Sequence, residues 1–224
     1  MVRKNYLPFV AAMALVVVAS NVLVQFPVQA TLGGLSLADV LTWGAFTYPI
    51  AFLVTDLANR RHGAAFARRV VLVGFALAVI CSIVAPPLLF RLGLLEFEAT
   101  AGRLVRIAIA SGAAFLTAQL LDVTVFNWLR RQAWWRAPIF GTLAGSVVDT
   151  MIFFSVAFAA TFAFIGPDDG FALEAAPLLG MLPVEAARWV SWALGDLTVK
   201  LAIAVFALIP YRLIAMRWSQ PKIA

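Results

Sequence analysis

The sequence predicts an all-α, polytopic membrane protein with six transmembrane helices in a single domain, residues 1–224, and both termini on the cytoplasmic side. Of the 224 residues, 63% are hydrophobic and 12% are charged, whereas soluble domains average about 45–50% apolar and about 25% charged residues. Six apolar segments are close to the roughly 20 residues that an α-helix needs to cross the hydrocarbon core. Arginine and lysine collect in alternate loops, which orients the chain in the membrane.

The first two segments are residues 6–26 and 37–55. Arg3 and Lys4 precede the first, an order that also occurs in secretory signal peptides. Its apolar core is longer than the roughly 7–15 residues of a signal peptide, so we interpret the segment as a transmembrane helix. The second segment ends before Asp56, which we expect at the cytoplasmic face as a helix cap or paired with an arginine.

The third and fourth segments are residues 70–89 and 104–129. Pro86 and Pro87 lie near the outer end of the third, where they predict a kink or an early end of the helix, because proline cannot donate a backbone hydrogen bond. Cys81 in the same segment is the only cysteine of the chain, so no intrachain disulfide can form.

The fifth and sixth segments are residues 138–165 and 188–209, and a Gly-Pro-Asp-Asp-Gly turn signal at 166–170 follows the fifth. Trp134 and Trp135 precede the fifth segment. Tryptophan prefers the headgroup level of a bilayer, so this pair predicts an interfacial anchor.

The orientation follows from the basic residues, which favour the cytoplasmic side when they flank transmembrane helices. On the opposite side Arg91, Arg103 and Arg188 stand among several acidic residues. The following residues are therefore predicted to lie on the cytoplasmic side of the membrane: Arg3, Lys4, Arg60, Arg61, Arg68, Arg69, Arg130, Arg131, Arg136, Arg212, Arg217 and Lys222.

The net charge of +6 and the isoelectric point of 10.2 do not require a nucleic-acid partner. Basic loops that face an anionic leaflet explain them, and the lipid bilayer is the expected partner. His62 is the only histidine and lies in a basic loop. A histidine and cysteine metal site and a histidine-dependent catalytic triad are therefore excluded within the membrane, and no cofactor is predicted.

Ionisable residues within transmembrane helices are costly, so each is a candidate for function. Asp149 follows Pro138 by eleven residues, which places it about 17 Å along a helix that rises about 1.5 Å per residue, near the middle of the bilayer. Ser146 and Phe153 share its helix face. We predict that these three residues bind substrate; the alternative is that Asp149 bonds to a neighbouring helix.

Asp196 and Lys200 lie one turn apart in the sixth segment, so their charges can neutralise each other on one face. A lipid-facing helix would avoid both charges. The face must therefore turn toward the interior of the bundle, where Lys200 can also meet Asp149. A structural pair and a substrate-binding pair are both compatible with this spacing.

Further polar residues complete a discontinuous polar path across the membrane, which begins with Asn21 and Gln25 and ends with Asp56. Asn21 lies near the outer end of the first segment and Arg106 near that of the fourth, whereas Gln119 and Asp122 lie toward the cytoplasmic end of the fourth. Asn21 could bind a solute or bond to a neighbouring helix, whereas Arg106 could instead only extend its guanidinium to the outer headgroups. We interpret the path as a route for a polar solute.

Several ordered motifs accompany this path. They are Phe46-Thr47-Tyr48-Pro49 through Thr55-Asp56-Leu57, Asn59-Arg60, Arg106 through Ser111, Gln119-Leu-Leu-Asp122, Val125-Phe126-Asn127, Gly141-Thr142-Leu143 through Asp149-Thr150, and Asp196 with Lys200. Together they resemble the queuosine precursor transporter family, the vitamin-uptake-transporter group of inner-membrane proteins, over nearly all of residues 40–212. The chain departs from the family pattern at Gly145-Ser146, where we expect Gly-Asn.

The resemblance implies uptake of 7-cyano-7-deazaguanine (preQ0) or 7-aminomethyl-7-deazaguanine (preQ1), and no enzymatic activity. The guanine-like edge of these molecules presents two neighbouring N–H donors, which one carboxylate can accept in bidentate fashion. Asp149 or Asp122 suits this role, and Phe153 suits stacking on the flat ring. Assembly of several copies of the chain stays open.

Two other functions are compatible with parts of the sequence. Ala193-Leu194-Gly195-Asp196 differs by one residue from the Gly-x-Gly-Asp signature of intramembrane aspartyl proteases, but the partner Tyr-Asp motif is absent. The chain could also be the substrate-binding membrane subunit of an ATP-driven importer. It contains no phosphate-binding loop of its own, so such an importer would need a separate ATPase.

Overall fold

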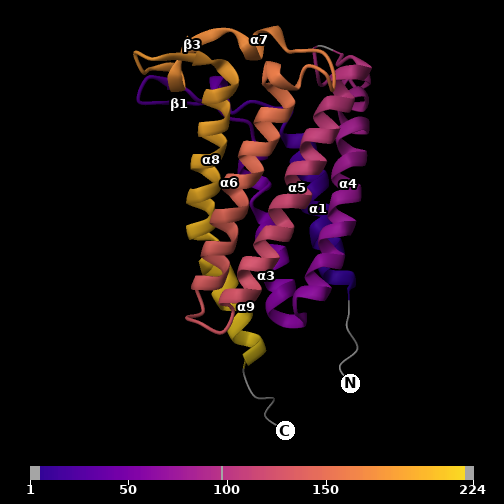
Figure 1. Cartoon of the computed structure of the whole chain (residues 1–224), viewed down its shortest axis with the longest axis vertical. Coiled ribbons are helices and arrows are strands. Elements are labelled where there is room, and N and C mark those ends of the chain that lie inside the picture. Colours follow the sequence, from indigo (N-terminus) through magenta and orange to yellow (C-terminus); the bar gives the residue numbers. More distant parts are fainter. Residues whose placement is uncertain (1–5, 97, 220–224) are drawn as a thin grey trace.

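The computed structural model describes residues 6–96 and 98–219, which form an elongated bundle of helices (Figure 1). Arg3, Lys4 and Lys222 of the predicted cytoplasmic group lie outside the described residues. The helices are α1 (Leu7–Leu23), α2 (Gly44–Thr47), α3 (Ile50–His62), α4 (Ala64–Arg91), α5 (Ala101–Leu129), α6 (Arg136–Phe158), α7 (Gly170–Leu173), α8 (Arg188–Phe206) and α9 (Leu208–Ser219).

Short strands and single 3₁₀ turns occur only in the connections between the described helices. Two antiparallel pairs are present, β1 (Thr31–Leu32) with β2 (Leu35–Ser36), and β3 (Ala175–Pro177) with β4 (Glu185–Ala187). Both pairs and α7 lie at one end of the bundle, which we call the loop end (Figure 1). α1 begins and α9 ends at the opposite end, which we call the basic end.

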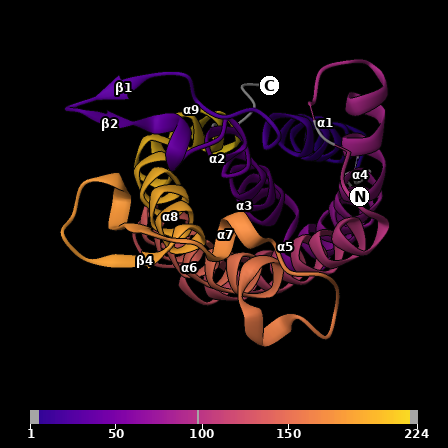
Figure 2. The ribbon, with the colours of Figure 1, turned by 90° about the horizontal axis from the view of Figure 1, so that it is seen from above.

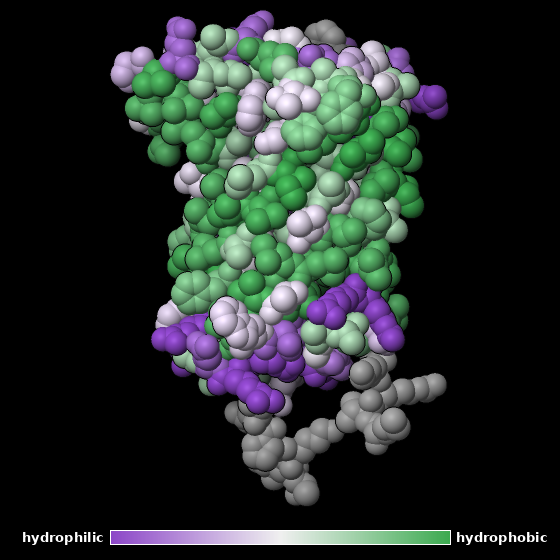
Figure 3. Space-filling view, viewed as in Figure 1, coloured by the Kyte–Doolittle hydropathy of each residue, from purple (hydrophilic) through white to green (hydrophobic). Residues whose placement is uncertain are grey.

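The fold is that of an all-α membrane protein. Within the described ranges, four helical stretches are long and apolar enough to cross a membrane, and α1 is a shorter apolar helix of 17 residues. The four are Ala64–Arg91, Ala101–Leu129, Arg136–Phe158 and Arg188–Trp218. Apolar residues cover the middle of the bundle, and hydrophilic residues gather at the basic end (Figure 3).

The second predicted segment, residues 37–55, is not one helix. Its first part forms a 3₁₀ turn and the short α2, and α3 starts only at Ile50 and continues to His62. Pro49 stands at the start of α3, where a missing backbone N–H costs nothing. The prediction that Asp56 ends this helix at the membrane face was wrong: Asp56 lies in the middle of α3 and is 2% exposed.

Other helix ends also differ from the prediction. α4 runs through Pro86 and Pro87 to Arg91, so the helix does not end at the prolines. α3 and α4 are joined by Gly63 alone, which adopts a φ of +89° that favours glycine. α6 ends at Phe158, because the chain turns extended at Ala159.

The helices pack around α3 as seen from the loop end (Figure 2). α3 contacts α1, α4, α5, α6 and α9, while α5 packs along both α4 and α6. A hydrophobic core joins α1, α3, α4 and α5, and includes Met13, Ala58, Val70 and Phe115. Because α3 is central, the side chains on its faces meet several other helices, and this position determines the sites described below.

Candidate functional site

A cavity of about 520 Å³ opens between the helices in the half of the bundle nearest the loop end. Such a volume falls within the roughly 300–1,000 Å³ of small-molecule sites. Lining residues recur every three or four residues along the long helices, so one face of each helix borders the cavity. The lining residues nearest the basic end are Ala114 on α5, Asp149 on α6 and Lys200 on α8. These residues define its inner end.

Three charged side chains meet at this inner end. Lys200 Nζ lies 2.7 Å from Asp149 Oδ2 and 2.5 Å from Asp196 Oδ2. Tyr48 donates its hydroxyl to Asp149 Oδ1 at 3.0 Å, and Thr150 donates to Asp196 Oδ2 at 2.9 Å. Two carboxylates share one ammonium group, so this triad carries a net charge of −1 when all three groups are ionised.

The spacing of α8 explains why the triad forms. Asp196 and Lys200 stand one turn apart, so both point toward α6, where Asp149 and Thr150 meet them. Gly195 allows α8 to approach the segment before α2, because a methyl group there would lie 2.7 Å from the carbonyl oxygen of Val40. The predicted contact between Asp196 and Lys200 is present, and so is the contact between Lys200 and Asp149.

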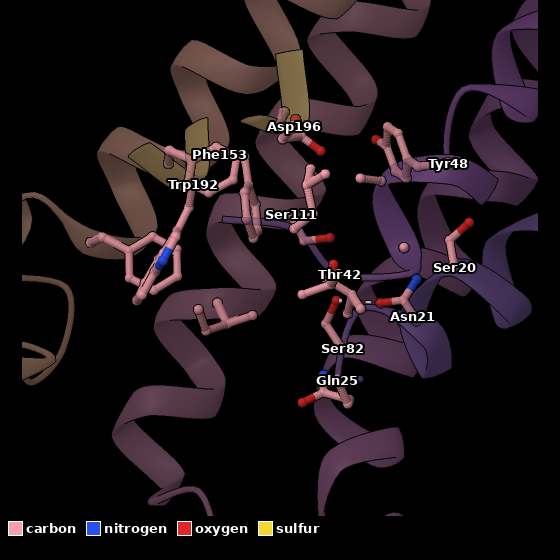
Figure 4. A pocket seen from close by; sticks show the side chains of 18 of the residues that line it. Ser20, Asn21, Gln25, Thr42, Tyr48, Ser82, Ser111, Phe153, Trp192 and Asp196 are labelled. Carbon is pink, nitrogen blue, oxygen red and sulfur yellow. Dashed lines mark hydrogen bonds between the residues drawn. The ribbon is translucent and has the colours of Figure 1, made fainter. Parts of the chain in front are cut away.

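The two long sides of the cavity differ in chemistry (Figure 4). Phe153 and Trp192 lie on one side, where Phe158 packs edge-on against Trp192 at a centroid distance of 5.3 Å. Asn21 and Ser82 lie on the opposite side, and Ser82 donates a hydrogen bond to Asn21 Oδ1 at 3.0 Å. The cavity thus offers aromatic faces, amide and hydroxyl groups, and a charged inner end.

Five of the nine predicted site residues line this cavity: Asn21, Asp149, Phe153, Asp196 and Lys200. Tyr48 and Trp192 line it too, and sequence reasoning gave neither a role. The sequence contains a feature that could have identified each of them. Tyr48 belongs to the Phe46-Thr47-Tyr48-Pro49 motif, and Trp192 precedes Asp196 by one helical turn.

Arg106 does not line the cavity. Its side chain is 0% exposed and donates to the carbonyl oxygens of Val156, Ala159, Gly166 and Pro167, and to Asp168 at 2.8 Å. Arginine has five N–H donors in a planar fork, which suits such a set of acceptors. In this structure Arg106 on α5 forms hydrogen bonds to the segment that follows α6, residues 159–168, and so holds this segment against α5.

Gln119, Asp122 and Ser146, the other three predicted site residues, lie closer to the basic end in a second group of buried polar side chains. We call it the inner cluster: Thr55, Asp56, Asn59, Gln119, Asp122, Thr142 and Ser146. Thr55 donates to Gln119 Oε1 at 2.6 Å, and Asn59 donates to the carbonyl oxygen of Val123 at 3.1 Å. The cluster joins α3, α5 and α6.

Two arginines bridge α3 and α5 beyond the inner cluster. Arg60 donates to the carbonyl oxygen of Arg130 at 2.9 Å, and Arg130 donates to that of Arg60 at 3.3 Å. Arg60 also donates to the hydroxyl of Tyr211 on α9 at 2.8 Å. These bonds hold three helices together at the basic end.

The sequence of the chain is similar to those of known transporters. The family described as putative vitamin uptake transporter matches residues 42–214. The chain is 36% identical over 200 residues to the queuosine precursor transporter of Escherichia coli strain K12. The matched region covers 88% of this chain and 79% of that relative. The chain belongs to this transporter family.

Two further relatives carry related names. The probable queuosine precursor transporter of Haemophilus influenzae is 41% identical over 153 residues, which are 64% of this chain and 65% of the relative. That of Bacillus subtilis strain 168 is 29% identical over 181 residues, which are 76% of this chain and 69% of the relative. No solved structure matches the chain. The region matched to the family includes every predicted site residue except Asn21.

Proposed function

We propose that the chain is an uptake transporter for the queuosine precursors preQ0 and preQ1, located in the inner (cytoplasmic) membrane. The observation that carries the proposal is the cavity of this chain, which has a charged inner end beside aromatic walls, in a protein related to a queuosine precursor transporter. Apolar and aromatic lining with a few polar groups is typical of small-molecule sites.

The chemistry of a deazaguanine fits the lining residues. A carboxylate accepts the two N–H donors of the guanine-like edge, and we assign this role to Asp149. Lys200 donates to Asp149 Oδ2 at 2.7 Å and thereby orients this carboxylate at the inner end of the cavity. Phe153 and Trp192 supply ring faces for the flat heterocycle.

The triad argues against an aspartyl enzyme. Such a mechanism needs two carboxylates that share a proton, whereas Asp149 and Asp196 each contact Lys200 instead. Membership in a transporter family supports the same conclusion.

Purified protein should bind preQ0 and preQ1 at least about tenfold more tightly than guanine if the 7-substituent is recognised, since a difference of about 1.4 kcal/mol corresponds to a factor of ten. Calorimetric titration of each compound checks this. Uptake by proteoliposomes that contain this chain alone would exclude a required ATPase partner. Absence of binding for both precursors would contradict the proposal.

We further propose that the membrane topology has six transmembrane segments, with α1 and the α2–α3 region added to the four long helices. The described basic residues of the predicted cytoplasmic group lie on α3, α4, α6 and α9 or in the connection after α5. All of these positions belong to the basic end (Figures 1 and 3). Positive loops favour the cytoplasm, so both termini are assigned to that side.

Cysteine labelling tests the orientation. In a Cys81→Ser background, a membrane-impermeant thiol reagent added outside intact cells should label Glu98→Cys near the loop end. The same reagent should leave Gln132→Cys, which follows α5 at the basic end, unlabelled until the membrane is permeabilised. The reverse pattern would contradict the orientation.

A further inference from the structure

The inner cluster holds a set of buried polar atoms without partners. Within residues 6–96 and 98–219, six buried side-chain atoms lack a hydrogen-bond partner, and all six belong to this cluster. They are Asp56 Oδ1, Asn59 Oδ1, Gln119 Nε2, Asp122 Oδ1, Asp122 Oδ2 and Ser146 Oγ. Buried polar groups in native proteins are nearly always hydrogen bonded, so this concentration requires an explanation.

The unpartnered atoms are short of donors. Four of them are carboxylate or amide oxygens that can only accept, whereas Gln119 Nε2 alone can only donate. Asp122 is 0% exposed and has no partner on either oxygen. What the cluster lacks is therefore hydrogen-bond donors.

The two carboxylates approach the same turn of α6. Thr142 Oγ1 lies 3.5 Å from Asp56 Oδ2, and a methyl group on the neighbouring Gly141 would lie 2.5 Å from Asp122 Oδ1. Glycine at 141 thus lets the Asp122 carboxylate lie against the helix backbone. Two ionised carboxylates buried this completely would be costly without a compensating charge.

The cations near the cluster have other partners. Arg60 lies one turn from Asp56 on α3, but its guanidinium bonds to Tyr211 and to the carbonyl oxygen of Arg130. Lys200 bonds to Asp149 and Asp196. Among the described residues, neither Asp56 nor Asp122 forms an ion pair.

We propose that Asp56 and Asp122 hold one exchangeable proton and that this proton enters the cell together with the substrate. A proton from the outer solution binds a carboxylate oxygen, which then donates to a neighbouring acceptor. Release of the proton to the cytoplasm restores the carboxylate. This inference rests on the proposed function and adds the ion that drives it.

The arrangement along α6 connects this site to the cavity. Thr142, Ser146 and Asp149 follow one another at intervals of four and three residues, so they share one helix face. Ser146 therefore lies between the triad at the inner end of the cavity and the Asp56 and Asp122 carboxylates. Its unpartnered hydroxyl can donate and accept, as a proton relay requires.

A proton fits this site better than a sodium ion. Sodium sites in transporters draw on backbone carbonyls that unwound helices set free. α3, α5 and α6 run without interruption past the cluster, so their carbonyls are engaged in the helices.

Proteoliposomes containing the whole chain can test the coupling, with preQ0 as the uncharged substrate, the membrane potential clamped and a pH dye inside. When the outer solution is one pH unit more acidic than the interior, preQ0 should accumulate inside up to about tenfold if one proton enters with each substrate molecule. Without an imposed gradient, external preQ0 should acidify the interior. The variants Asp56→Asn and Asp122→Asn should lose both effects, yet bind preQ0 and exchange it across the membrane within about twofold of wild type, because exchange moves no net proton.

The control is Glu98→Gln, the same acid-to-amide change at an exposed position near the loop end, which should keep gradient-driven accumulation. Wild-type accumulation of preQ0 that does not respond to a pH gradient, or accumulation driven by a sodium gradient alone, would overturn the inference and leave the proposed function intact. So would full accumulation by both aspartate variants. Absence of both binding and exchange in the wild type would overturn the proposed function and the inference together.

Discussion

Lys200→Met is expected to lower the stability of the protein more than any other single change in the cavity. Asp149 and Asp196 would then face each other without the ammonium group that lies within 2.7 Å of both. Breaking a buried ion pair by removing one partner costs about 3–5 kcal/mol. We expect a large loss of membrane-inserted protein and a lower thermal midpoint in detergent, with no measurable preQ0 binding.

The triad predicts how this loss is repaired. Adding Asp196→Asn to Lys200→Met still leaves Asp149 buried without its cation, so this double variant should recover only part of the stability. The triple variant with Asp149→Asn removes all three charges and should recover most of it, because an uncharged amide is easier to bury than a carboxylate. Normal stability of Lys200→Met alone would show that the triad does not hold these helices together.

Asp149→Asn is expected to weaken preQ0 binding by at least about tenfold, the second large effect. The amide replaces one acceptor oxygen with a donor that would face the donors of the ligand. One or two charge-assisted hydrogen bonds at about 1.5–3 kcal/mol each are lost. The variant should reach the membrane normally, since Lys200 keeps Asp196 as its partner, yet fail to support queuosine formation from imported precursor.

Titration of the purified variant with preQ0 measures this effect, and Glu98→Gln serves as the matched acid-to-amide control. Unchanged affinity in Asp149→Asn would refute the assignment. The role would then pass to Asp196, whose side chain also lines the cavity and is 15% exposed, compared with 4% for Asp149.

The helical class and much of the triad could be predicted from the sequence. Hydropathy identifies α4, α5, α6 and α8, because a chain that crosses the hydrocarbon core must satisfy its backbone hydrogen bonds within one continuous helix. Such a helix therefore appears in the sequence as one long apolar stretch. The four-residue spacing of Asp196 and Lys200 places both on one face of α8. The distance of Asp149 from Pro138 places it near the middle of its own helix. These are local properties of single helices, which a sequence shows directly.

The α2–α3 region could not be predicted in this way. Residues 37–55 are apolar enough for a helix, but close packing against α1 and α8 favours turns instead: a methyl group on Gly44 would lie 2.8 Å from the Cα atom of Val24. Hydropathy also does not tell whether a buried polar side chain faces a cavity or another helix. For that reason Arg106 and Asp122 looked equivalent to Asp149 in the sequence, although only Asp149 lines the cavity.

The paired arginine bonds at the basic end bear on the speed of the carrier rather than on its affinity. If the basic end faces the cytoplasm, as proposed, a carrier that releases its substrate there must open the bundle at that end in every turnover. The Arg60 and Arg130 guanidinium groups each hold the carbonyl oxygen of the other residue, so both bonds must break together in that step. On the proposed orientation these two bonds therefore oppose the separation of α3 from α5 at the cytoplasmic end, while neither arginine lines the cavity.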